Sequence, residues 1–451
     1  MSRVFIISSN TTTDPYPVYP LGMAVVAGAL QAAGHQVRQY DCLAQGESIP
    51  QLLQAIEDFA PDLLSISLRN IDNVDSFSGE DAWYLQKSKE FVAELRKTVK
   101  VPIVVGGPAL TIMPEEIAEY LAVDHAVIGE GERSLPQLVD RLAAGEAVPQ
   151  LISRNQPLAG DEFSAPLFDQ ELVSYYLQQS GMVNLQTKRG CPYRCSYCSY
   201  PHLEGKQFRI RNPRLVVDEL ERLKQEHGVE RVFFTDSVFN DPHGEYLKLV
   251  EEMLSRDLGM QWSAFFRPQG FGREELALMK RAGLYALELG TDAAADRTLV
   301  GLDKRLCFTE ILEVNRACLE ERLPAAHFVM FGGPDEDGAS LTEGLQNLAQ
   351  FGASVVFAFS GIRIHPGAPL HQRAIEEGII SAETSLLKPV YYFSPLLDRE
   401  WMEETIEKSF YGQRNRIFPP SEGAKRMEVM TRFGFRGLMW DRLVRFPKTA
   451  Q

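Results

Sequence analysis

Short apolar runs alternate with helical patterns along most of this chain, and this alternation restricts the fold more than any other feature. The first series of runs falls at 4–7, 37–40, 63–68, 103–105 and 126–128. Short buried strands separated by helices form parallel sheets that are covered on both faces. Residues 1–145 are therefore predicted to form a doubly wound, Rossmann-like α/β domain.

A second series of apolar runs falls at 183–187, 231–235, 261–265, 285–289, 326–331 and 355–364. Six strand–helix units predict a partial (β/α)6 TIM-like barrel over residues 183–370, with its chemistry at the carboxyl ends of the strands. One helix should begin at Asn212-Pro213, because asparagine caps a helix and proline suits its first position. The face of that helix expected to be buried carries Leu215, Val216, Leu220 and Leu223.

Two regions lack this alternation. Residues 146–182 contain Pro149, Pro157 and Pro166 without clear periodicity, and are predicted to be a linker. Residues 371–451 are rich in aromatic side chains and are predicted to form a mostly helical C-terminal domain.

Composition narrows the possible classes. The net charge of -15 argues against a general binder of nucleic acid or of anionic membranes. No apolar run approaches the roughly 20 residues that span a bilayer. Cys42, Cys307 and Cys318 are scattered without the spacing of a disulfide framework. A reducing cytoplasm is therefore the expected location.

Three cysteines crowd into the loop after the first barrel strand, in the stretch GCPYRCSYC. Packing alone does not require Cys191, Cys195 and Cys198 together. Structural zinc needs four ligands, usually from two paired elements, and only His202 lies nearby to complete such a set. Three thiolates suit a [4Fe–4S] cluster in which one iron lacks a protein ligand and can bind a small chelating molecule.

This CxxxCxxC loop, placed after the first strand of a partial barrel, resembles that of the radical S-adenosylmethionine superfamily. Tyr197, the aromatic residue before the last cysteine, also matches. The resemblance implies that S-adenosylmethionine chelates the fourth iron and is cleaved by one electron to a 5′-deoxyadenosyl radical. It also implies an electron donor such as flavodoxin or ferredoxin.

Later strands carry segments that resemble the S-adenosylmethionine contacts of that superfamily. "TDS" ends the second barrel strand, and "ELGTD" resembles the fourth-strand ELGxES segment with Asp292-Ala293 in place of Glu-Ser. "RIHPGAPL" resembles the sixth-strand RxxPGTxL segment. The contacts implied by the resemblance are Tyr197, Thr235, Asp236, Ser237, Glu288, Asp292 and Arg363.

The N-terminal domain is similar to that of the cobalamin-binding subgroup, so the resemblance covers nearly the whole chain. The matching stretches are "PLGMAVVAGALQAAGHQVRQYD", "IVVGGP" and "VIGEGERSL". A Rossmann-like nucleotide domain is the alternative, although no G-x-G-x-x-G turn follows the first strand. The cobalamin-binding residues implied are Arg69, Asn70, Gly106, Gly107, Pro108, Gly129, Glu130, Gly131 and Glu132.

One departure from the subgroup concerns the lower face of cobalt. Many cobalamin-binding domains place a histidine ligand in a first-loop DxHxxG motif, whereas Asp14 stands here without a histidine. Arg69 follows the third strand, where an unpaired charge is costly. Two interpretations stay open: Arg69 pairs with Asp72 or Asp75, or it lies under the corrin, disfavours a lower ligand and eases methyl transfer from cobalt.

The resemblance implies a C-methyltransferase that moves methyl from cobalamin to an unactivated carbon of a small-molecule, lipid-precursor or peptide substrate. Radical rearrangement or cyclisation, and polar methyl transfer, are alternatives within the enzyme class. A non-catalytic cobalamin sensor is the alternative from another class. The sequence identifies neither the substrate nor the catalytic residues, and gives no oligomeric state. Six aromatic residues either line the substrate cavity or belong to the core, namely Tyr16, Tyr19, Phe239, Phe266, Phe331 and Trp401.

Overall fold

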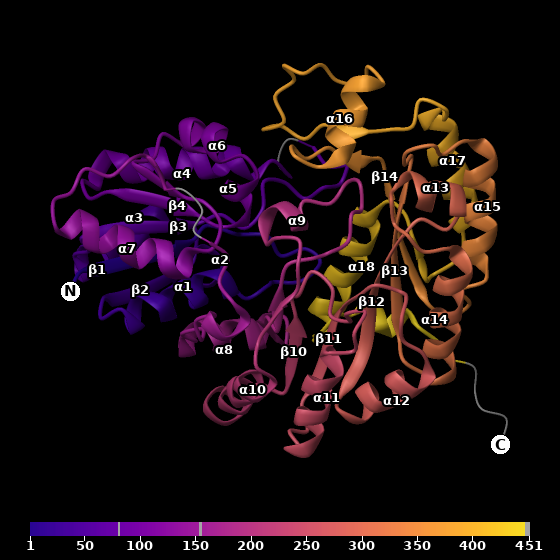
Figure 1. Ribbon diagram of the computed structural model, residues 1–451, viewed down its shortest axis with the longest axis horizontal. Coiled ribbons are helices and arrows are strands. Elements are labelled where there is room, and N and C mark those ends of the chain that lie inside the picture. The colour runs from indigo at the N-terminus through magenta and orange to yellow at the C-terminus, as the bar shows by residue number, and fades with distance from the viewer. Residues whose placement is uncertain (80–81, 153–155, 447–451) are drawn as a thin grey trace.

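The computed structural model describes residues 1–79, 82–152 and 156–446, so residues 153–155 of the expected linker and 447–451 of the expected C-terminal domain lie outside the described residues. Two α/β units stand side by side, with the helix α9 (Tyr200–Leu203) between them (Figure 1). The first unit is indigo and purple in that view, and the second runs from magenta to yellow.

The first unit is a parallel sheet in the order β2-β1-β3-β4-β5-β6. Its strands are β1 (Arg3–Ser8), β2 (Gln36–Asp41), β3 (Leu63–Ser67), β4 (Ile103–Gly106), β5 (His125–Val127) and β6 (Leu151–Ile152). Its helices are α1 (Leu21–Ala32), α2 (Cys42–Gln45), α3 (Ile49–Phe59), α4 (Tyr84–Thr98), α5 (Pro108–Ile112), α6 (Pro114–Leu121) and α7 (Gly131–Ala143).

The central strand β1 shows why these apolar runs form strands. Val4 and Ile6 belong to one hydrophobic core, while Phe5 and Ile7 belong to another on the opposite side of the sheet. Helices cover both faces of the sheet, so the strand is a continuous apolar run rather than an alternating one.

The second unit is a parallel, seven-stranded sheet in the order β17-β14-β13-β12-β11-β10-β7. Its strands are β7 (Val183–Leu185), β10 (Arg231–Phe234), β11 (Gln261–Phe266), β12 (Leu284–Asp292), β13 (Ala325–Phe331), β14 (Val355–Ser360) and β17 (Arg416–Ile417). Two small antiparallel pairs accompany it, β8 (Lys188–Arg189) with β9 (Arg209–Ile210) and β15 (Ile362–Arg363) with β16 (Tyr391–Tyr392). The six predicted barrel strands are all present.

Helices follow the barrel strands as expected. They are α10 (Pro213–His227), α11 (Tyr246–Ser255), α12 (Arg273–Arg281), α13 (Asp296–Gly301), α14 (Phe308–Glu320), α15 (Gly338–Ala349), α16 (Pro369–Glu376), α17 (Arg399–Phe410) and α18 (Pro420–Arg432). The start of α10 is as predicted, because the Asn212 side chain accepts a hydrogen bond from the backbone N–H of Arg214 at 3.0 Å. Its buried face was only partly predicted: Leu215 is 49% exposed and Val217 is buried in its place.

The segment expected to be a linker contains regular structure. Its first part adds β6 to the first sheet, and a short 3₁₀ turn (Gly160–Glu162) and helix α8 (Gln170–Gln179) follow. The chain between them crosses α1, where the backbone N–H of Leu167 donates to the Ala24 carbonyl at 2.9 Å. A Cβ atom on Gly28 would lie 2.1 Å from the Ala165 carbonyl oxygen, so this crossing requires glycine.

The C-terminal region is less helical than predicted, because helices cover fewer than half of its described residues (371–446), and it also completes the barrel. β17 pairs with β14 at the sheet edge, and Trp440 begins a 3₁₀ turn (Trp440–Leu443). Trp440 packs in one core cluster with Phe233 and Ala286 of the barrel strands and with Tyr16 of the first loop. Within the described residues, no helix combines the length and apolarity needed to cross a bilayer.

Candidate active site

The three motif cysteines lie in the loop after β8, at the carboxyl end of the barrel. Cys191 is buried, whereas Cys195 and Cys198 are partly exposed. Gly190 opens the loop with φ +87°, and its carbonyl accepts from the Ser237 hydroxyl at 2.9 Å. The loop is therefore held by contacts to its own backbone, and its three thiols are free.

The thiols fit an iron–sulfur cluster. Burial raises the pKa of the Cys198 thiol to about 12, and a bound metal removes that proton outright. In the part of the chain that the structure describes, no three His, Cys, Asp or Glu side chains surround a single ion position. A cluster binds one thiolate on each iron, so its cysteines need not converge on one point.

Tyr197 connects the cysteine loop to the end of β12. Its hydroxyl donates to Asp292 Oδ2 at 2.5 Å, and the same oxygen receives the buried Lys304 ammonium group. Although burial disfavours the charge of Lys304, the Asp292 carboxylate raises its pKa. Lys304 also interacts electrostatically with Cys195. A buried cation thus stands beside the cluster loop, and no motif in the sequence indicated it.

Arg267 is a second cation near this loop that sequence reasoning missed. It is buried, its guanidinium lies 4.2 Å from the ring centre of Tyr193, and it donates to the carbonyl of Lys304. It follows directly on β11, a barrel strand at whose end the sequence analysis found no motif. Arg267 and Lys304 together place positive charge near the cluster thiols, where negative charge collects when they ionise.

The "TDS" residues after β10 bond to the first strand and the cysteine loop. Asp236 is fully buried and accepts from the backbone N–H groups of Thr187 at 2.7 Å and Lys188 at 3.2 Å. The Thr235 hydroxyl donates to the Leu185 carbonyl at 3.3 Å. These predicted contacts of S-adenosylmethionine therefore lie next to the cluster loop, but Asp236 is already largely satisfied by the protein.

Glu288 lies inside the barrel, apart from Asp292. Its Oε1 accepts from the Trp440 indole N–H at 2.9 Å. Burial raises the pKa of Glu288 to about 7, although the indole N–H favours the ionised form. Tyr16, from the first loop of the other unit, is close enough for the Glu288 carboxylate to raise the pKa of its phenol further, beyond the effect of burial.

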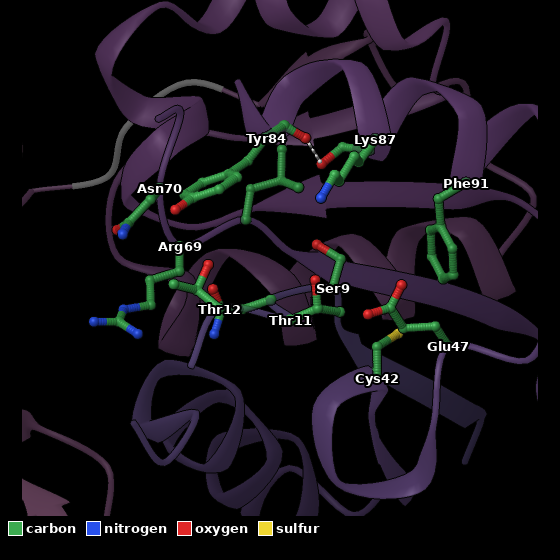
Figure 2. Close-up of a pocket in the computed structure, with 13 residues that line it drawn as sticks. Ser9, Thr11, Thr12, Cys42, Glu47, Arg69, Asn70, Tyr84, Lys87 and Phe91 are labelled. Atoms are coloured by element: carbon green, nitrogen blue, oxygen red, sulfur yellow. Dashed lines mark hydrogen bonds between the residues drawn. The ribbon is translucent and has the colours of Figure 1, made fainter. Parts of the chain in front are cut away.

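A cleft of about 680 Å³, part of it open to solvent, lies at the carboxyl ends of β1 and β3. Figure 2 shows Ser9, Thr11, Thr12, Arg69 and Asn70 along it. This is the edge at which parallel sheets bind ligands. The polar lining and the position fit the corrin-binding role that the resemblance implies.

Arg69 is accessible from this cleft, but the protein around it desolvates the guanidinium and lowers its pKa. Tyr16 and Tyr200 interact with it electrostatically. Tyr200 stands two residues after Cys198, so the strand-end loops of the two units face each other. Among the described residues, no hydrogen bond or ion pair involves the Arg69 guanidinium.

The acidic neighbours proposed for Arg69 bond elsewhere. Asp72 pairs with Arg363, with 2.8 Å between Oδ2 and Nε. Asp75 accepts from the backbone N–H of Phe77 at 3.1 Å. The interpretation in which Arg69 pairs with Asp72 or Asp75 is therefore wrong.

The remaining predicted cobalamin residues form the neighbouring loops. Gly107 has φ +104°, and a Cβ there would lie 2.5 Å from the Leu68 carbonyl oxygen, so this glycine allows β3 and β4 to end side by side. Gly106 ends β4, and Pro108 begins α5. Gly129 donates its N–H to the Thr111 hydroxyl at 3.0 Å.

Glu130 and Glu132 pair with arginines of the barrel unit. Arg189 lies 2.6 Å from Glu132 and 3.2 Å from Glu130, and Arg209 lies 2.7 Å from Glu130. Although burial opposes ionisation, the two guanidinium groups hold the pKa of Glu130 below its usual range. Gly131, between the two acids, begins α7 where it packs against Val26 of α1.

The aromatic residues considered for the cavity are mostly core residues. Tyr19, Phe239, Phe266 and Phe331 are fully buried in the two large hydrophobic clusters. Trp401 is 45% exposed on α17. Of the six, Tyr16 interacts electrostatically with both Arg69 and Glu288.

Two family models match the two units. The B12 binding domain model matches residues 7–139, and the radical SAM superfamily model matches residues 185–346. The chain belongs to the cobalamin-binding radical S-adenosylmethionine enzymes. The expected fold class, family and cofactors, a [4Fe–4S] cluster, S-adenosylmethionine and cobalamin, are confirmed.

Several named relatives of this radical S-adenosylmethionine enzyme are methyltransferases. An uncharacterized methyltransferase of Pyrococcus horikoshii is 25% identical over 82% of this chain and 80% of its own length. The tryptophan 2-C-methyltransferase of Streptomyces laurentii is 22% identical over 80% of this chain and 73% of its own length. These names agree with the expected activity class, an enzyme rather than a sensor.

The fold is that of a solved enzyme of the same family. The radical S-adenosylmethionine methyltransferase TsrM of Kitasatospora setae, solved with cobalamin and a [4Fe–4S] cluster, superposes with a TM-score of 0.85. The superposition covers 98% of this chain and 97% of TsrM at 21% sequence identity. The two-unit arrangement therefore persists where few residues are shared.

Proposed function

We propose that this enzyme transfers a methyl group from cobalamin to an unactivated carbon of a small molecule, by a radical route, with Arg69 in place of a histidine beneath the corrin. One observation carries this proposal. Arg69 lies on the wall of the strand-end cleft without a carboxylate partner among the described residues, in a chain whose first loop has no histidine. An unpaired guanidinium repels a metal cation, so it keeps a lower ligand from forming.

The positions of the loops described above indicate which residues would hold each cofactor. Cys191, Cys195 and Cys198 bind the cluster. S-Adenosylmethionine lies between that loop and the ends of β10 and β12, near Ser237 and Asp292. Cobalamin lies on the strand-end edge of the first unit, against the loops of Arg69, Asn70, Gly106, Gly107, Pro108 and Gly129. When bound, the cluster supplies the electron that cleaves S-adenosylmethionine, and cobalamin carries the methyl group.

The chain's own side chains set the charge and protonation of this site. Lys304 and Arg267 offset the negative charge of the cluster thiolates. The carboxyl group of Glu288, whose pKa is near neutrality, can hold a proton inside the barrel at physiological pH. Tyr16 and Trp440 cover this carboxyl from two sides and limit its access to water.

The partners proposed are a small-molecule, lipid-precursor or peptide substrate and a one-electron donor such as flavodoxin or ferredoxin. All six cysteines are free thiols, which suits the reducing cytoplasm in which such donors work.

The test uses the reconstituted holoenzyme and S-adenosylmethionine with a deuterated methyl group. L-Tryptophan is the first probe, because it is the substrate in the name of one relative, and a metabolite extract of the source organism is the second. We expect the label to reach first the bound cobalamin and then a carbon of the product, with deoxyadenosine formed alongside. Variants of the three cluster cysteines should form neither labelled product nor deoxyadenosine.

Three outcomes separate the possibilities. A labelled product without deoxyadenosine overturns the radical route in favour of polar methyl transfer. Deoxyadenosine with an unlabelled product overturns methyl transfer in favour of rearrangement or cyclisation. Cobalamin that never acquires label overturns the role proposed for the first unit.

A further inference from the structure

Arg363 has its hydrogen-bonding capacity used within the protein, although the resemblance implied a contact with S-adenosylmethionine. Its Nε donates to Asp72 Oδ2 at 2.8 Å, its Nη1 to the Ile364 carbonyl at 2.6 Å, and its Nη2 to the Leu386 carbonyl at 2.8 Å. The side chains of Arg363 and Asp72 are 2% and 1% exposed. A guanidinium held in this way leaves little for a ligand.

Asp72 belongs to the loop after β3, three residues beyond Arg69. Its second oxygen accepts from the backbone N–H of Val74 at 2.9 Å, which closes a turn in that loop. The loop touches the barrel unit again where the Ser76 hydroxyl donates to the Ser360 carbonyl at 2.5 Å, and where Phe77 packs edge-on against Phe418. The barrel therefore holds the far side of the loop.

The near side of the same loop is held by the first unit. The backbone N–H of Leu68 donates to the Gly106 carbonyl at 2.9 Å, and the Leu68 carbonyl accepts from Ala109 at 3.2 Å. Arg69 and Asn70 lie between these two anchors. Arg69 makes no hydrogen bond of its own among the described residues, so the backbone position from which its side chain extends depends on these anchors and on the bond from the Tyr84 N–H to the Ile71 carbonyl at 2.9 Å.

A buried ion pair between two domains is a poor source of stability, because desolvation offsets most of the attraction. Its better-attested effect is to fix one arrangement among several. Here the fork of Arg363 allows one register between the loop after β3 and the end of the barrel, since all three of its partners lie in fixed backbone or buried positions.

We propose that the Asp72–Arg363 pair is a latch between the two units that positions Arg69 against cobalamin, and that Arg363 is a positioning residue rather than a contact of S-adenosylmethionine. This inference rests on the proposed function, because it assigns the latch to the cobalamin side of that reaction. The latch ties β15, which directly follows the sixth barrel strand of the radical unit, to the loop proposed to face the corrin.

The test compares four variants of the reconstituted holoenzyme. Arg363→Lys keeps the charge but loses the fork, and Asp72→Asn keeps the shape and the turn but loses the charge. Arg69→Ala is the reference for a displaced guanidinium. Arg416→Lys is the matched control, because Arg416 is also buried in the barrel and donates to the Ser354 and Leu348 carbonyls, both at 2.8 Å, without touching the first unit.

Two readouts that do not need turnover are recorded. The absorption spectrum of bound cobalamin, with the electron paramagnetic resonance spectrum of its Co(II) form, reports the lower face of cobalt. Equilibrium binding of S-adenosylmethionine reports the other site. We expect both latch variants to shift the cobalamin spectra in the direction of Arg69→Ala, and S-adenosylmethionine affinity to stay within about twofold of the wild type.

Opposite results overturn the latch. If Arg363→Lys weakens S-adenosylmethionine binding by about tenfold or more and leaves the cobalamin spectra unchanged, Arg363 is a ligand contact. If the latch variants behave like Arg416→Lys, with a lower unfolding temperature and wild-type spectra, the pair is only structural. Failure of the proposed function looks different, because then Arg69→Ala itself leaves the cobalamin spectra unchanged.

Discussion

Gly190 shows how much of the site depends on one backbone position. Its φ of +87° is a conformation that side chains disfavour, and a Cβ there would lie 2.0 Å from the Gln207 carbonyl oxygen. The N–H of the next residue, Cys191, donates to the Gly205 carbonyl at 3.0 Å. Cys191, the first of the proposed cluster ligands, is thus placed by a close approach of two backbone segments that only glycine permits.

Replacement of Gly190 by alanine should therefore abolish cluster assembly. The backbone at Gln207 must move to relieve the overlap, and Cys191 moves with it. Iron and sulfide bound per chain after reconstitution measure the effect, and we expect a loss of most of both.

Gly205→Ala is the matched control for this substitution. Gly205 also has a positive φ, of +95°, but nothing lies within 4 Å of its Cβ position. The Gly205→Ala substitution should lower the free energy of unfolding only by the conformational strain of about 1–2 kcal/mol, and the variant should keep its iron. Equal iron content in the two variants would show that the close approach to Gln207 does not determine the cluster site.

Site residues that belong to a sequence motif could be predicted from the sequence. Site residues that matter because of a distant side chain they contact could not. The three cysteines were predicted from their spacing, and their loop lies where expected. Lys304 was missed, since its importance arises only when the chain folds it against Asp292, twelve residues earlier. Arg363 was predicted as a ligand contact because its segment matches a motif, whereas its partner Asp72 lies 291 positions away.

At the scale of elements, a buried polar network joins two strands and a helix of the barrel. His327 of β13 is bonded through Nδ1 to the Thr291 hydroxyl of β12 at 2.7 Å, and through Nε2 to Asn315 Oδ1 of α14 at 3.0 Å. Ser354, just before β14, donates to the same asparagine oxygen at 2.6 Å. Burial, with a smaller effect of Arg416, lowers the pKa of His327 to about 3.

The low pKa of His327 predicts that this histidine, by itself, lowers the stability of the barrel in mild acid. The unfolded chain binds a proton on His327 near pH 6.5 and the folded chain does not, so each pH unit between about 6.5 and 3 costs about 1.4 kcal/mol. Glu288 works in the opposite direction, because its raised pKa favours the folded state as the pH falls. Only a comparison of variants therefore isolates the histidine.

The comparison is between His327→Gln and the wild type in denaturant titrations at pH 8 and pH 5.5. We expect the variant to be less stable at pH 8, because the network is damaged, and to lose less stability on acidification, by about 1 kcal/mol. His243→Gln, at an exposed histidine, should keep the pH dependence of the wild type. An unchanged slope in His327→Gln would mean that this histidine is protonated in the folded state.

Strands and helices were predictable where their own residues form an apolar pattern. The five strands expected in the first unit and the six expected in the barrel are mostly apolar runs, and all appeared. The two-residue strands β6 and β17 exist only because a neighbouring strand offers its free edge, so no periodicity marks them. Helix α8 is capped by Asp169, whose side chain accepts from the backbone N–H groups of Glu171 and Leu172, but the surrounding prolines obscured it.

At the scale of the whole molecule, two sets of ionic contacts join the two units where their strand-end loops meet. One is the Asp72–Arg363 latch. The other is the group of Glu130, Glu132, Arg189 and Arg209, in which Arg189 immediately precedes Gly190. The strand-end loops of one unit are thereby attached to the base of the cluster loop of the other.

From this second set of contacts we predict that Glu132 is needed for the attachment of one unit to the other. The Arg189–Glu132 pair is buried, with side chains 11% and 5% exposed. Glu132→Gln removes one carboxylate partner of the buried Arg189 guanidinium. Such a loss lowers the free energy of unfolding by about 3 kcal/mol. We expect a lower unfolding temperature and, because Arg189 adjoins the cluster loop, a lower iron content after reconstitution.

A double-mutant cycle and an exposed pair on the same helix decide whether burial is the cause. With Arg189→Met added to Glu132→Gln, the total cost should be well below the sum of the single costs, since the unpaired charge is removed. Arg133 pairs with Glu162 at 2.9 Å, but the two side chains are 40% and 48% exposed, so Glu162→Gln should cost at most about 1 kcal/mol and leave the iron content unchanged. Two results would contradict this prediction: additive free-energy costs in the cycle, or equal losses of stability in the exposed and buried pairs. Either would mean that apolar contacts hold the units together and that the position of the cluster loop does not depend on charge.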